Sequence, residues 1–261
     1  MKAVILCGGS GTRLRELTEL QPKPMVEVGG RPIVWHILKG YAHHGVNDFI
    51  LCLGYKGHML KQYFLDYHAL ARDFTVTLGR RRILDFHGPE PEEDWRVTLA
   101  DTGEHSLTSK RLARIWPYLD ADETFCLTYG DGVCDLDFPA ALAFHRSCGR
   151  LATITGVRPP ARFGEIEHEN GLATAFWEKP AATAGLINGG FFFIEPGFRR
   201  YLPPADEEEM LERGPLRRCM RDGQLSVYVH TGFWQCMDTY RDWLHLETLW
   251  NENRAPWKIW T

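Results

Sequence analysis

Short apolar segments alternate with helix-like segments through the first half of this chain. The apolar segments have the length of buried strands: 3–6, 49–53, 125–128 and 152–156. The segments between them carry apolar side chains at helical spacing: 33–41, 56–67 and 138–148. This alternation predicts an α/β fold with a mixed, mainly parallel sheet flanked by helices, a Rossmann-like arrangement.

The segments between these elements have a different pattern. Short strands with alternating apolar residues are expected at 74–86 and 95–100, and glycines separate several short strands between residues 164 and 195. A charged helix is predicted at 205–222 and a tryptophan-rich helix at about 239–252. With 261 residues, 44% of them apolar, we expect a single domain that includes a small β-rich subregion.

The charge balance and the apolar pattern exclude several classes of function. A formal net charge of −4 gives no reason to expect nucleic acid as a partner. No apolar run approaches the ~18 residues of a membrane helix, and the run after Lys2 is too short for a secretory signal. The 7 Cys and 11 His show no metal-ligand spacing, and reduced thiols fit a cytoplasmic protein.

A glycine-rich loop at 8–13 directly follows the first strand. Its three glycines let the backbone approach a ligand closely, and their amides can point at phosphate oxygens. The loop lacks the lysine of a Walker motif, and Leu14 stands where a dinucleotide fingerprint needs its third glycine. Lys23 follows between two prolines, which restrict its backbone. Basic side chains beside an amide-lined loop predict a triphosphate site.

The glycine loop, the Pro-Lys-Pro segment and the strand end Thr128-Tyr129-Gly130-Asp131-Gly132 together resemble the sugar-1-phosphate nucleotidylyltransferases. The resemblance covers essentially the whole chain. The strand end at 128–132 and the C-terminal tail of the chain resemble the branch of the family that uses CTP. Further matching segments are Trp35-His36, Gly54-Tyr55-Lys56-Gly57, Asp101-Thr102-Gly103, Arg162-Phe163-Gly164, Glu178-Lys179-Pro180, Ile187-Asn188-Gly189-Gly190, Met237-Asp238-Thr239 and Ala255-Pro256-Trp257-Lys258.

The resemblance implies an enzyme that transfers a cytidylyl group from CTP to α-D-glucose 1-phosphate. The products would be pyrophosphate and CDP-glucose, which feeds deoxysugar synthesis for surface polysaccharide such as O-antigen. The sugar phosphate would attack the α-phosphorus in line without a covalent enzyme intermediate, so positioning and charge neutralisation dominate catalysis. The resemblance also implies Mg²⁺ as cofactor and a homo-oligomer, with a hexamer expected. Residues 1–150 would form the nucleotide-binding half, and 151–261 the sugar-binding and oligomerisation half.

By the same resemblance, the glycine loop and a polar loop before a helix bind the nucleotide. The residues implied are Leu6, Cys7, Gly8, Gly9, Ser10, Gly11, Thr12, Arg13, Ser106, Thr108, Arg111 and Gly130. Arg13 would stabilise the leaving pyrophosphate, and Lys23 would contact the α-phosphate or the sugar phosphate in the transition state. Arg111 suits the recognition of cytosine, because a guanidinium can donate to the acceptor edge of that base. A capped helix start explains Thr108 about as well.

The sugar and metal sites are implied mainly in the second half. The sugar phosphate would contact Gly164, Glu178, Lys179, Asn188 and Gly189. Of these, Lys179 would meet the phosphate, and Glu178 and Asn188 would meet sugar hydroxyls. Asp131 and Asp238 would bind Mg²⁺ together with phosphate oxygens, as expected for a hard ion with few protein ligands. From the residues alone, Asp238 also fits the N-cap of the last helix.

Other functions stay open at this stage. The same chemistry could use UTP or dTTP, or another hexose phosphate, since base choice rests on few hydrogen bonds. A catalytically silent nucleotide-sugar sensor could use the same fold, although Arg13, Lys23 and both aspartates are present. A nicotinamide-dependent oxidoreductase is disfavoured by Leu14 in the fingerprint.

Overall fold

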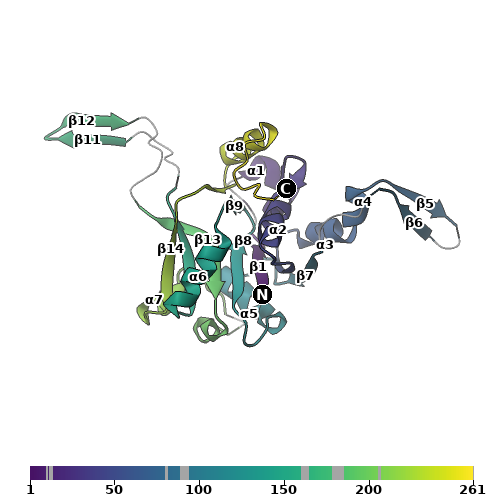
Figure 1. Cartoon of the computed structure of the whole chain (residues 1–261), viewed down its shortest axis with the longest axis horizontal. Helices are drawn as coiled ribbons and strands as arrows, with labels where there is room; N and C mark the ends of the chain where they lie inside the picture. Colours follow the sequence, from purple (N-terminus) through teal and green to yellow (C-terminus); the bar gives the residue numbers. More distant parts are fainter. Residues whose placement is uncertain are drawn as a thin grey trace.

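A seven-stranded sheet forms the centre of the computed structural model (Figure 1), which describes residues 1–9, 11, 14–79, 82–88, 94–159, 165–177, 185–204 and 207–260. In spatial order the strands are β14 (Leu225–His230), β10 (Ala152–Val157), β13 (Ile187–Ile194), β8 (Phe125–Tyr129), β1 (Lys2–Cys7), β4 (Asp48–Leu53) and β7 (Arg96–Asp101). β13 runs antiparallel to both of its neighbours, and the other pairs are parallel. The predicted mixed, mainly parallel sheet is therefore confirmed.

Helices cover both faces of this sheet. One face packs against α2 (Ile33–His43), α3 (Gly57–Leu65), α6 (Phe138–Cys148) and α8 (Tyr240–Asn251). The other face packs against α5 (Thr108–Ile115), the 3₁₀ helix η4 (Pro196–Tyr201) and α7 (Pro215–Arg221). Strand β1 is apolar after Lys2 because alternate residues enter different layers: Ile5 and Cys7 face α2, whereas Val4 and Leu6 face α5.

Short elements connect these layers. After β1 come α1 (Arg15–Thr18), the 3₁₀ helix η2 (Lys23–Met25), β2 (Glu27–Val28) and β3 (Arg31–Pro32). Later in the chain are α4 (Tyr67–Ala71), η3 (Trp116–Tyr118), β9 (Gly132–Cys134) and β15 (Trp234–Cys236). No helix in the described ranges combines the length and the apolar character needed to cross a bilayer.

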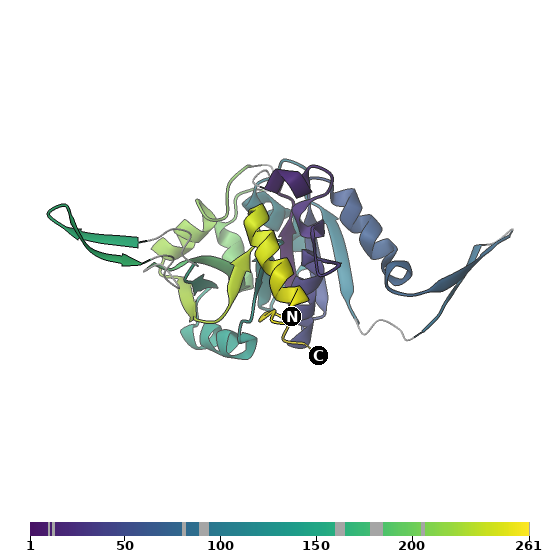
Figure 2. The same cartoon turned by 90° about the horizontal axis from the view of Figure 1, so that it is seen from above.

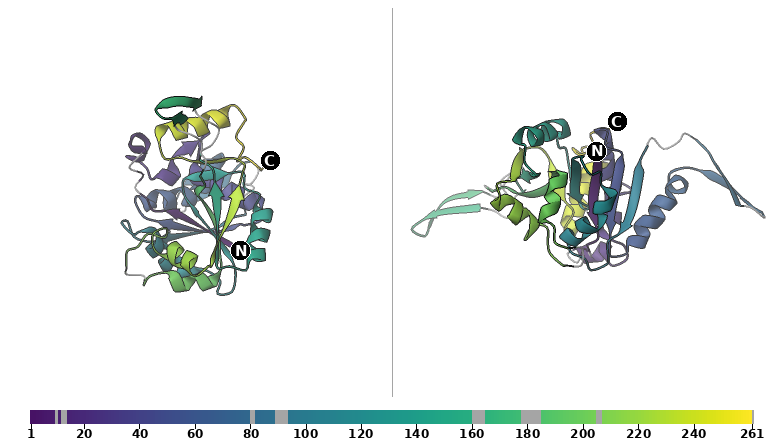
Figure 3. Two further views of the ribbon diagram at one scale, coloured as in Figure 1. Left: turned by 90° about the vertical axis from the view of Figure 1, so that its left-hand side faces the viewer. Right: turned by 90° about the horizontal axis from the view of Figure 1, so that it is seen from below.

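Two hairpins extend from opposite ends of the sheet body (Figures 1 and 2). One is formed by β5 (Phe74–Leu78) and β6 (Arg82–Phe86), the other by β11 (Glu165–Glu169) and β12 (Leu172–Trp177). Figure 3 shows the same separation from below. Opposite residues on an antiparallel pair share a face, so one side of the β5–β6 hairpin is mainly apolar, with Arg82 paired to Leu78 at its end. That side carries Phe74, Val76, Leu78, Leu84 and Phe86.

Two predicted helices differ from the observed ones. The helix predicted at 56–67 ends at Leu65, and α4 starts separately after Asp66. The helix predicted at 205–222 is wrong over most of its length, since only Pro215–Arg221 is helical within residues 207–222. Pro215 cannot continue a helix from its N-terminal side, because it lacks an N–H and its ring clashes with the preceding turn. It does fit as the first helical residue.

Candidate active site

Three charged side chains meet at the carboxyl edge of the sheet. The Lys23 Nζ donates to Asp131 Oδ2 at 2.6 Å and to Asp238 Oδ1 at 2.5 Å. Lys23 is only 9% exposed and begins η2 between Pro22 and Pro24, which restrict its backbone. Burial lowers the pKa of Lys23, but the two carboxylates raise it by more. Its net pKa is therefore above the ordinary value and the amine stays charged.

Backbone pairing explains why two aspartates so far apart in sequence converge. Asp131 lies in the turn between β8 and β9, and Asp238 follows β15. These two strands pair antiparallel, with Gly132 opposite Cys236. One residue further on, the Met237 N–H donates to Asp131 O at 2.8 Å. The β9–β15 ribbon thus fixes both carboxylates beside Lys23.

Asp242, in the first turn of α8, holds the segment that carries Asp238. Its Oδ2 accepts from the N–H of Asp238 at 3.2 Å and from the N–H of Thr239 at 2.8 Å. Its Oδ1 accepts from Gln235 Nε2 at 3.2 Å. Thr239 is the N-cap of α8 and forms a capping box with Asp242. The reading of Asp238 as the N-cap is therefore wrong, and its carboxylate faces Lys23 instead.

An open pocket lies beside Lys23 on the side of the glycine loop. Its empty volume is about 1370 Å³. The predicted site residues that line it are Leu6, Cys7, Gly8, Gly9, Lys23, Ser106, Thr108, Arg111, Gly130 and Asp131. They come from β1, η2, α5 and the end of β8. The sheet topology brings these elements to one edge, where ligands bind in open α/β sheets.

Glycines allow the close packing of this wall. A Cβ on Gly8 would lie 2.0 Å from Arg111 Cζ, and a Cβ on Gly130 would lie 3.0 Å from Leu6 O. Gly11 instead turns the loop, with φ +61°, and its carbonyl accepts from the Leu14 N–H at 2.9 Å. Larger residues at positions 8 and 130 would force the wall apart.

The Arg111 guanidinium is directed at the backbone of the pocket wall. Its Nη1 donates to Leu53 O at 2.9 Å and to Gly103 O at 2.8 Å. Its Nη2 donates to Gly8 O at 3.1 Å and to Glu104 O at 3.2 Å. Arg111 thus ties the glycine loop to the ends of β4 and β7. These bonds occupy Arg111 donors in the nucleotide-free protein, and its donation to cytosine stays a prediction.

The start of α5 and the polar loop before it contribute hydroxyl groups to the same pocket. Thr108 Oγ1 accepts from the Leu211 N–H at 2.8 Å and donates to Glu212 Oε2 at 3.3 Å. Ser106 Oγ accepts from Arg114 Nη1 at 3.4 Å. Thr108 is the first residue of α5, and no described side chain caps that helix. Helix capping therefore does not account for Thr108.

A second open pocket meets the first at Tyr129 and Asp131, which line both pockets. Its empty volume is about 1120 Å³. The lining includes Asn188, Gly189, Trp234 and Asp238. Asn188 Nδ2 donates to Tyr129 OH at 3.1 Å, and Trp234 Nε1 donates to Gly189 O at 2.7 Å. The predicted sugar residues Asn188 and Gly189 therefore lie across the aspartates from the glycine loop.

Tyr129 and Glu212 form a bridge between the pockets that the sequence analysis did not assign. Tyr129 OH donates to Glu212 Oε1, while the other oxygen of that carboxylate accepts from Thr108. Burial, and then the negative Glu212, raise the pKa of Tyr129, so its hydroxyl remains a donor. The position of Tyr129 beside Gly130 and Asp131 was a usable signal. Glu212 lies in an acidic segment where nothing distinguishes it from its neighbours.

The cysteines in the two pockets are not activated thiols. Burial raises the pKa of Cys7 well above its ordinary value. Burial, with a further contribution from Asp238, raises the pKa of Cys236 to about 12. Both thiols stay protonated at neutral pH, which agrees with a reaction that has no covalent enzyme intermediate.

Several predicted site residues lie outside the described part of the chain: Ser10, Thr12, Arg13, Gly164, Glu178 and Lys179. The first three belong to the loop after β1. The other three belong to the segments on either side of the β11–β12 hairpin. Their roles stay predictions.

Asp131 and Asp238 suit a hard divalent cation. Carboxylates are the donors that Mg²⁺ prefers, and these two converge on one positive group, the Lys23 Nζ. Within the described ranges, no group of three or more His, Cys, Asp or Glu could hold a metal on its own. Phosphate oxygens and water would therefore complete the ligand shell, as is usual for Mg²⁺.

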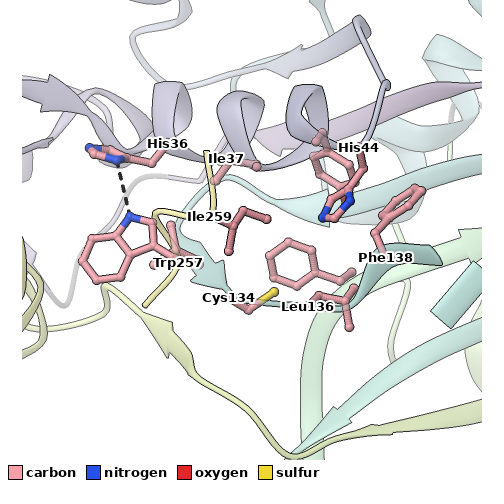
Figure 4. A pocket seen from close by; sticks show the side chains of 13 residues that line it. His36, Ile37, His44, Cys134, Leu136, Phe138, Trp257 and Ile259 are labelled. Carbon is pink, nitrogen blue, oxygen red and sulfur yellow. Dashed lines mark hydrogen bonds between the residues drawn. The ribbon is translucent and has the colours of Figure 1, made fainter. Parts of the chain in front are cut away.

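A third pocket, between α2 and β9, has a different character (Figure 4). Its empty volume is about 380 Å³. Most of its side chains are apolar, among them Ile37, Leu136, Phe138 and Ile259. Its described lining contains no Asp, Glu, Lys or Arg. The charged side chains that could meet a phosphate or a metal ion lie instead at the two pockets beside Lys23.

Comparison with known proteins identifies the family of this chain. A family model described as "Nucleotidyl transferase" matches residues 2–250. A "Glucose-1-phosphate cytidylyltransferase" of Salmonella typhi is 46% identical over 260 residues, covering 100% of both chains. A "Probable glucose-1-phosphate cytidylyltransferase" of Bacillus subtilis is 43% identical over 260 residues, again covering 100% of both chains.

Among solved structures, a protein designated a glucose-1-phosphate thymidylyltransferase from Bacillus anthracis, in complex with a sucrose, is similar in fold. The TM-score is 0.70 at 17% sequence identity, with 100% of this chain and 97% of that chain covered. Together these matches confirm the predicted fold class and the resemblance to sugar-1-phosphate nucleotidylyltransferases. The chain belongs to the nucleotidyl transferase family.

Proposed function

We propose that the protein transfers the cytidylyl group of CTP to α-D-glucose 1-phosphate, giving CDP-glucose and pyrophosphate. One observation carries the proposal: two open pockets share Tyr129 and Asp131, with the Lys23 amine at their border. Two pockets that meet at a buried cation suit the joining of two anionic substrates. Full-length relatives at 46% and 43% identity carry the name of an enzyme with this activity, which supports the choice of substrates.

The pocket beside the glycine loop would hold CTP. Backbone amides of Gly8 and Gly9 can face phosphate oxygens, and Arg13 would stabilise the leaving pyrophosphate. We assign Arg111 to shaping the base pocket through the carbonyls that it holds. The hydroxyls of Ser106 and Thr108 would then hydrogen-bond the cytosine.

The pocket lined by Asn188 and Gly189 would hold the sugar phosphate, with Glu178 and Lys179 completing it. Because the two pockets meet at Asp131, a sugar phosphate oxygen would approach the α-phosphorus from the side opposite the glycine loop. A bond forms between that oxygen and the α-phosphorus, and the bond from the α-phosphorus to the pyrophosphate oxygen breaks. This arrangement suits an in-line displacement.

Lys23 would donate to phosphate oxygens as negative charge builds up on them in the transition state. Such a preorganised donor typically contributes about 3 kcal/mol of transition-state stabilisation. Asp131 and Asp238 would hold Mg²⁺, which supplies Lewis-acid polarisation of the phosphate when bound. The ribbon of β9 and β15 keeps the two carboxylates in place for this task.

Pyrophosphate release, measured with Mg²⁺ and glucose 1-phosphate in parallel with CTP, UTP, dTTP, ATP and GTP, tests the proposal. We expect release with CTP alone. Release with UTP or dTTP instead would support nucleotidyl transfer and contradict the assignment of CTP as the substrate. If none of the five nucleotides gave pyrophosphate release while CDP-glucose bound tightly, the protein would be a sensor and not an enzyme.

We also propose that the protein forms a homo-oligomer, with six subunits expected, through its projecting hairpins. An isolated two-stranded hairpin is marginally stable in water. The apolar side of β5–β6 nevertheless leaves Leu78 85% exposed and Phe74 and Val76 38% exposed. A second copy of the chain would cover this side.

Sedimentation velocity tests the assembly. Val76→Asp places a charge on the apolar side of the hairpin and should dissociate the oligomer. Thr77→Asp is the matched control, because Thr77 lies on the opposite side of the same strand. A wild-type protein that sediments as a single 30.0-kDa chain would contradict this proposal.

The cellular setting follows from the proposed chemistry. CTP and glucose 1-phosphate are intracellular metabolites, so we place the enzyme in the cytoplasm. Its product would serve deoxysugar synthesis for surface polysaccharide such as O-antigen.

A further inference from the structure

Lys23 lies where a divalent cation shared by Asp131 and Asp238 would have to bind. Its Nζ is 2.6 Å from one carboxylate oxygen and 2.5 Å from the other. Only 11% of the Lys23 side chain is exposed, and the flanking Pro22 and Pro24 hold its backbone. The amine is therefore a resident cation of this carboxylate pair.

The ammonium and a divalent ion compete for the same place. A Mg²⁺ ion needs oxygen ligands at about 2.0–2.1 Å, so it cannot bind between Asp131 Oδ2 and Asp238 Oδ1 while Nζ contacts both oxygens. Two partly buried carboxylates that face the same place repel each other, and a cation between them offsets this repulsion. A metal ion that binds between these oxygens therefore displaces the amine.

A phosphate offers Lys23 another anionic partner, because the lysine also lines the nucleotide pocket. We propose that Lys23 is the counter-ion of Asp131 and Asp238 in the nucleotide-free protein, and that it exchanges onto a nucleotide phosphate when the metal takes its place. This inference rests on the proposed nucleotide site. It implies that the metal ion binds weakly in the absence of nucleotide and that the metal ion and the nucleotide bind cooperatively.

Titration of the nucleotide-free protein with Mn²⁺, followed by the electron paramagnetic resonance of free Mn²⁺, tests the exchange. Lys23→Gln and Lys23→Met remove the charge and keep most of the side-chain length. We expect each variant to bind Mn²⁺ about tenfold or more tightly than the wild type, because the Lys23 ammonium no longer competes for the carboxylates.

Two further variants serve as controls. Lys2→Gln removes another ion-paired lysine, which meets Asp120 at 3.2 Å at the far end of β1, and should bind Mn²⁺ as the wild type does. Adding Asp131→Asn to Lys23→Gln should abolish the gain, which places the ion at the aspartates. Circular dichroism checks that each variant is folded.

A measurement on the wild type needs no variant at all. Crystals soaked with Mn²⁺ alone should show no anomalous peak between the aspartates, whereas crystals with Mn²⁺ and CTP should show one, with the Lys23 amine on a phosphate. A peak with Mn²⁺ alone, or equal Mn²⁺ affinity of wild type and Lys23→Gln, would overturn the exchange. The titration uses no nucleotide, so its result is independent of whether CTP proves to be the substrate.

Discussion

At the scale of single residues, Lys23 has two partners in the resting protein and a different one in the proposed reaction. Lys23→Ala should therefore lower kcat by about 10²–10³-fold, because a preorganised donor to the transition state is lost. The KM for CTP should change less than about tenfold, since the glycine loop still binds the nucleotide. Steady-state pyrophosphate release gives both constants. A near-normal kcat in a folded Lys23→Ala variant would contradict the assigned role.

Arg111 is a second buried charge, and it supports the pocket wall. Arg111→Lys keeps the charge but cannot reach carbonyls on several sides at once, since lysine lacks the planar fork. We expect the free energy of unfolding of the nucleotide-free protein to fall by about 2–3 kcal/mol, because buried carbonyls lose charged donors. Urea unfolding measures this change.

A neighbouring arginine provides the control for Arg111. Arg114 is exposed and donates to Thr102 O at 2.7 Å, so Arg114→Lys should change the free energy of unfolding by less than about 0.5 kcal/mol. If Arg111→Lys left the free energy of unfolding unchanged and weakened only CTP binding, direct recognition of cytosine would be the better account.

At the scale of elements, the regular parts of the fold could be predicted because their signals are local. The apolar strands and the helix at 138–148 are found where periodicity places them, and the last helix begins within a residue of its expected start. The prediction of a helix at 205–222 is wrong over most of its length, because acidic residues occur in both helices and loops and the helix starts only at Pro215. The amino-acid composition of this segment does not distinguish a helix from a loop.

Helix α8 supports the proposed metal ligand Asp238 through its first turn. Asp242→Ala removes the acceptor for the N–H groups of Asp238 and Thr239, so the Asp238 carboxylate loses its fixed orientation. We expect the Mg²⁺ concentration for half-maximal activity to rise about 10–100-fold, as for other residues that orient metal ligands. The free energy of unfolding should also fall by about 1 kcal/mol through loss of the capping box.

Asp137→Ala separates these two effects. Asp137 caps α6, and its side chain accepts from the Ala140 N–H at 3.0 Å, away from the site. It should lose similar stability with no change in the Mg²⁺ requirement. Equal Mg²⁺ requirements for Asp242→Ala and Asp137→Ala would show that Asp242 acts only as a helix cap.

At the scale of the whole molecule, the meeting of distant segments was beyond prediction from residue patterns. Family resemblance, and not spacing, paired Asp131 with Asp238, because the β9–β15 ribbon that joins them is formed by very short strands. The contact of Glu212 with Tyr129 depends on an irregular segment folding back onto the sheet. Such contacts are set by tertiary packing, which single-sequence periodicity does not encode.

The C-terminal segment closes on α2 through a buried histidine, and this contact makes stability depend on pH. Because Trp257 Nε1 can only donate, His36 Nδ1 accepts from it at 3.4 Å (Figure 4). The other ring nitrogen, Nε2, therefore donates to Val28 O at 2.8 Å. Burial lowers the pKa of His36 from 6.5 to about 4. The folded state therefore holds His36 neutral where the unfolded chain already binds a proton.

This difference in pKa has a definite sign. The contribution of His36 is fully present above pH 6.5 and is lost progressively as pH falls to about 4, and it amounts to about 3 kcal/mol. Urea unfolding of wild type and His36→Gln at several pH values between 7.5 and 4.5 isolates this term, because other titrating groups are common to both proteins. Glutamine can keep a donor for Val28 O but does not titrate. The wild type should lose more stability on acidification than His36→Gln, and parallel curves would show that His36 is protonated in the folded protein as readily as in the unfolded chain.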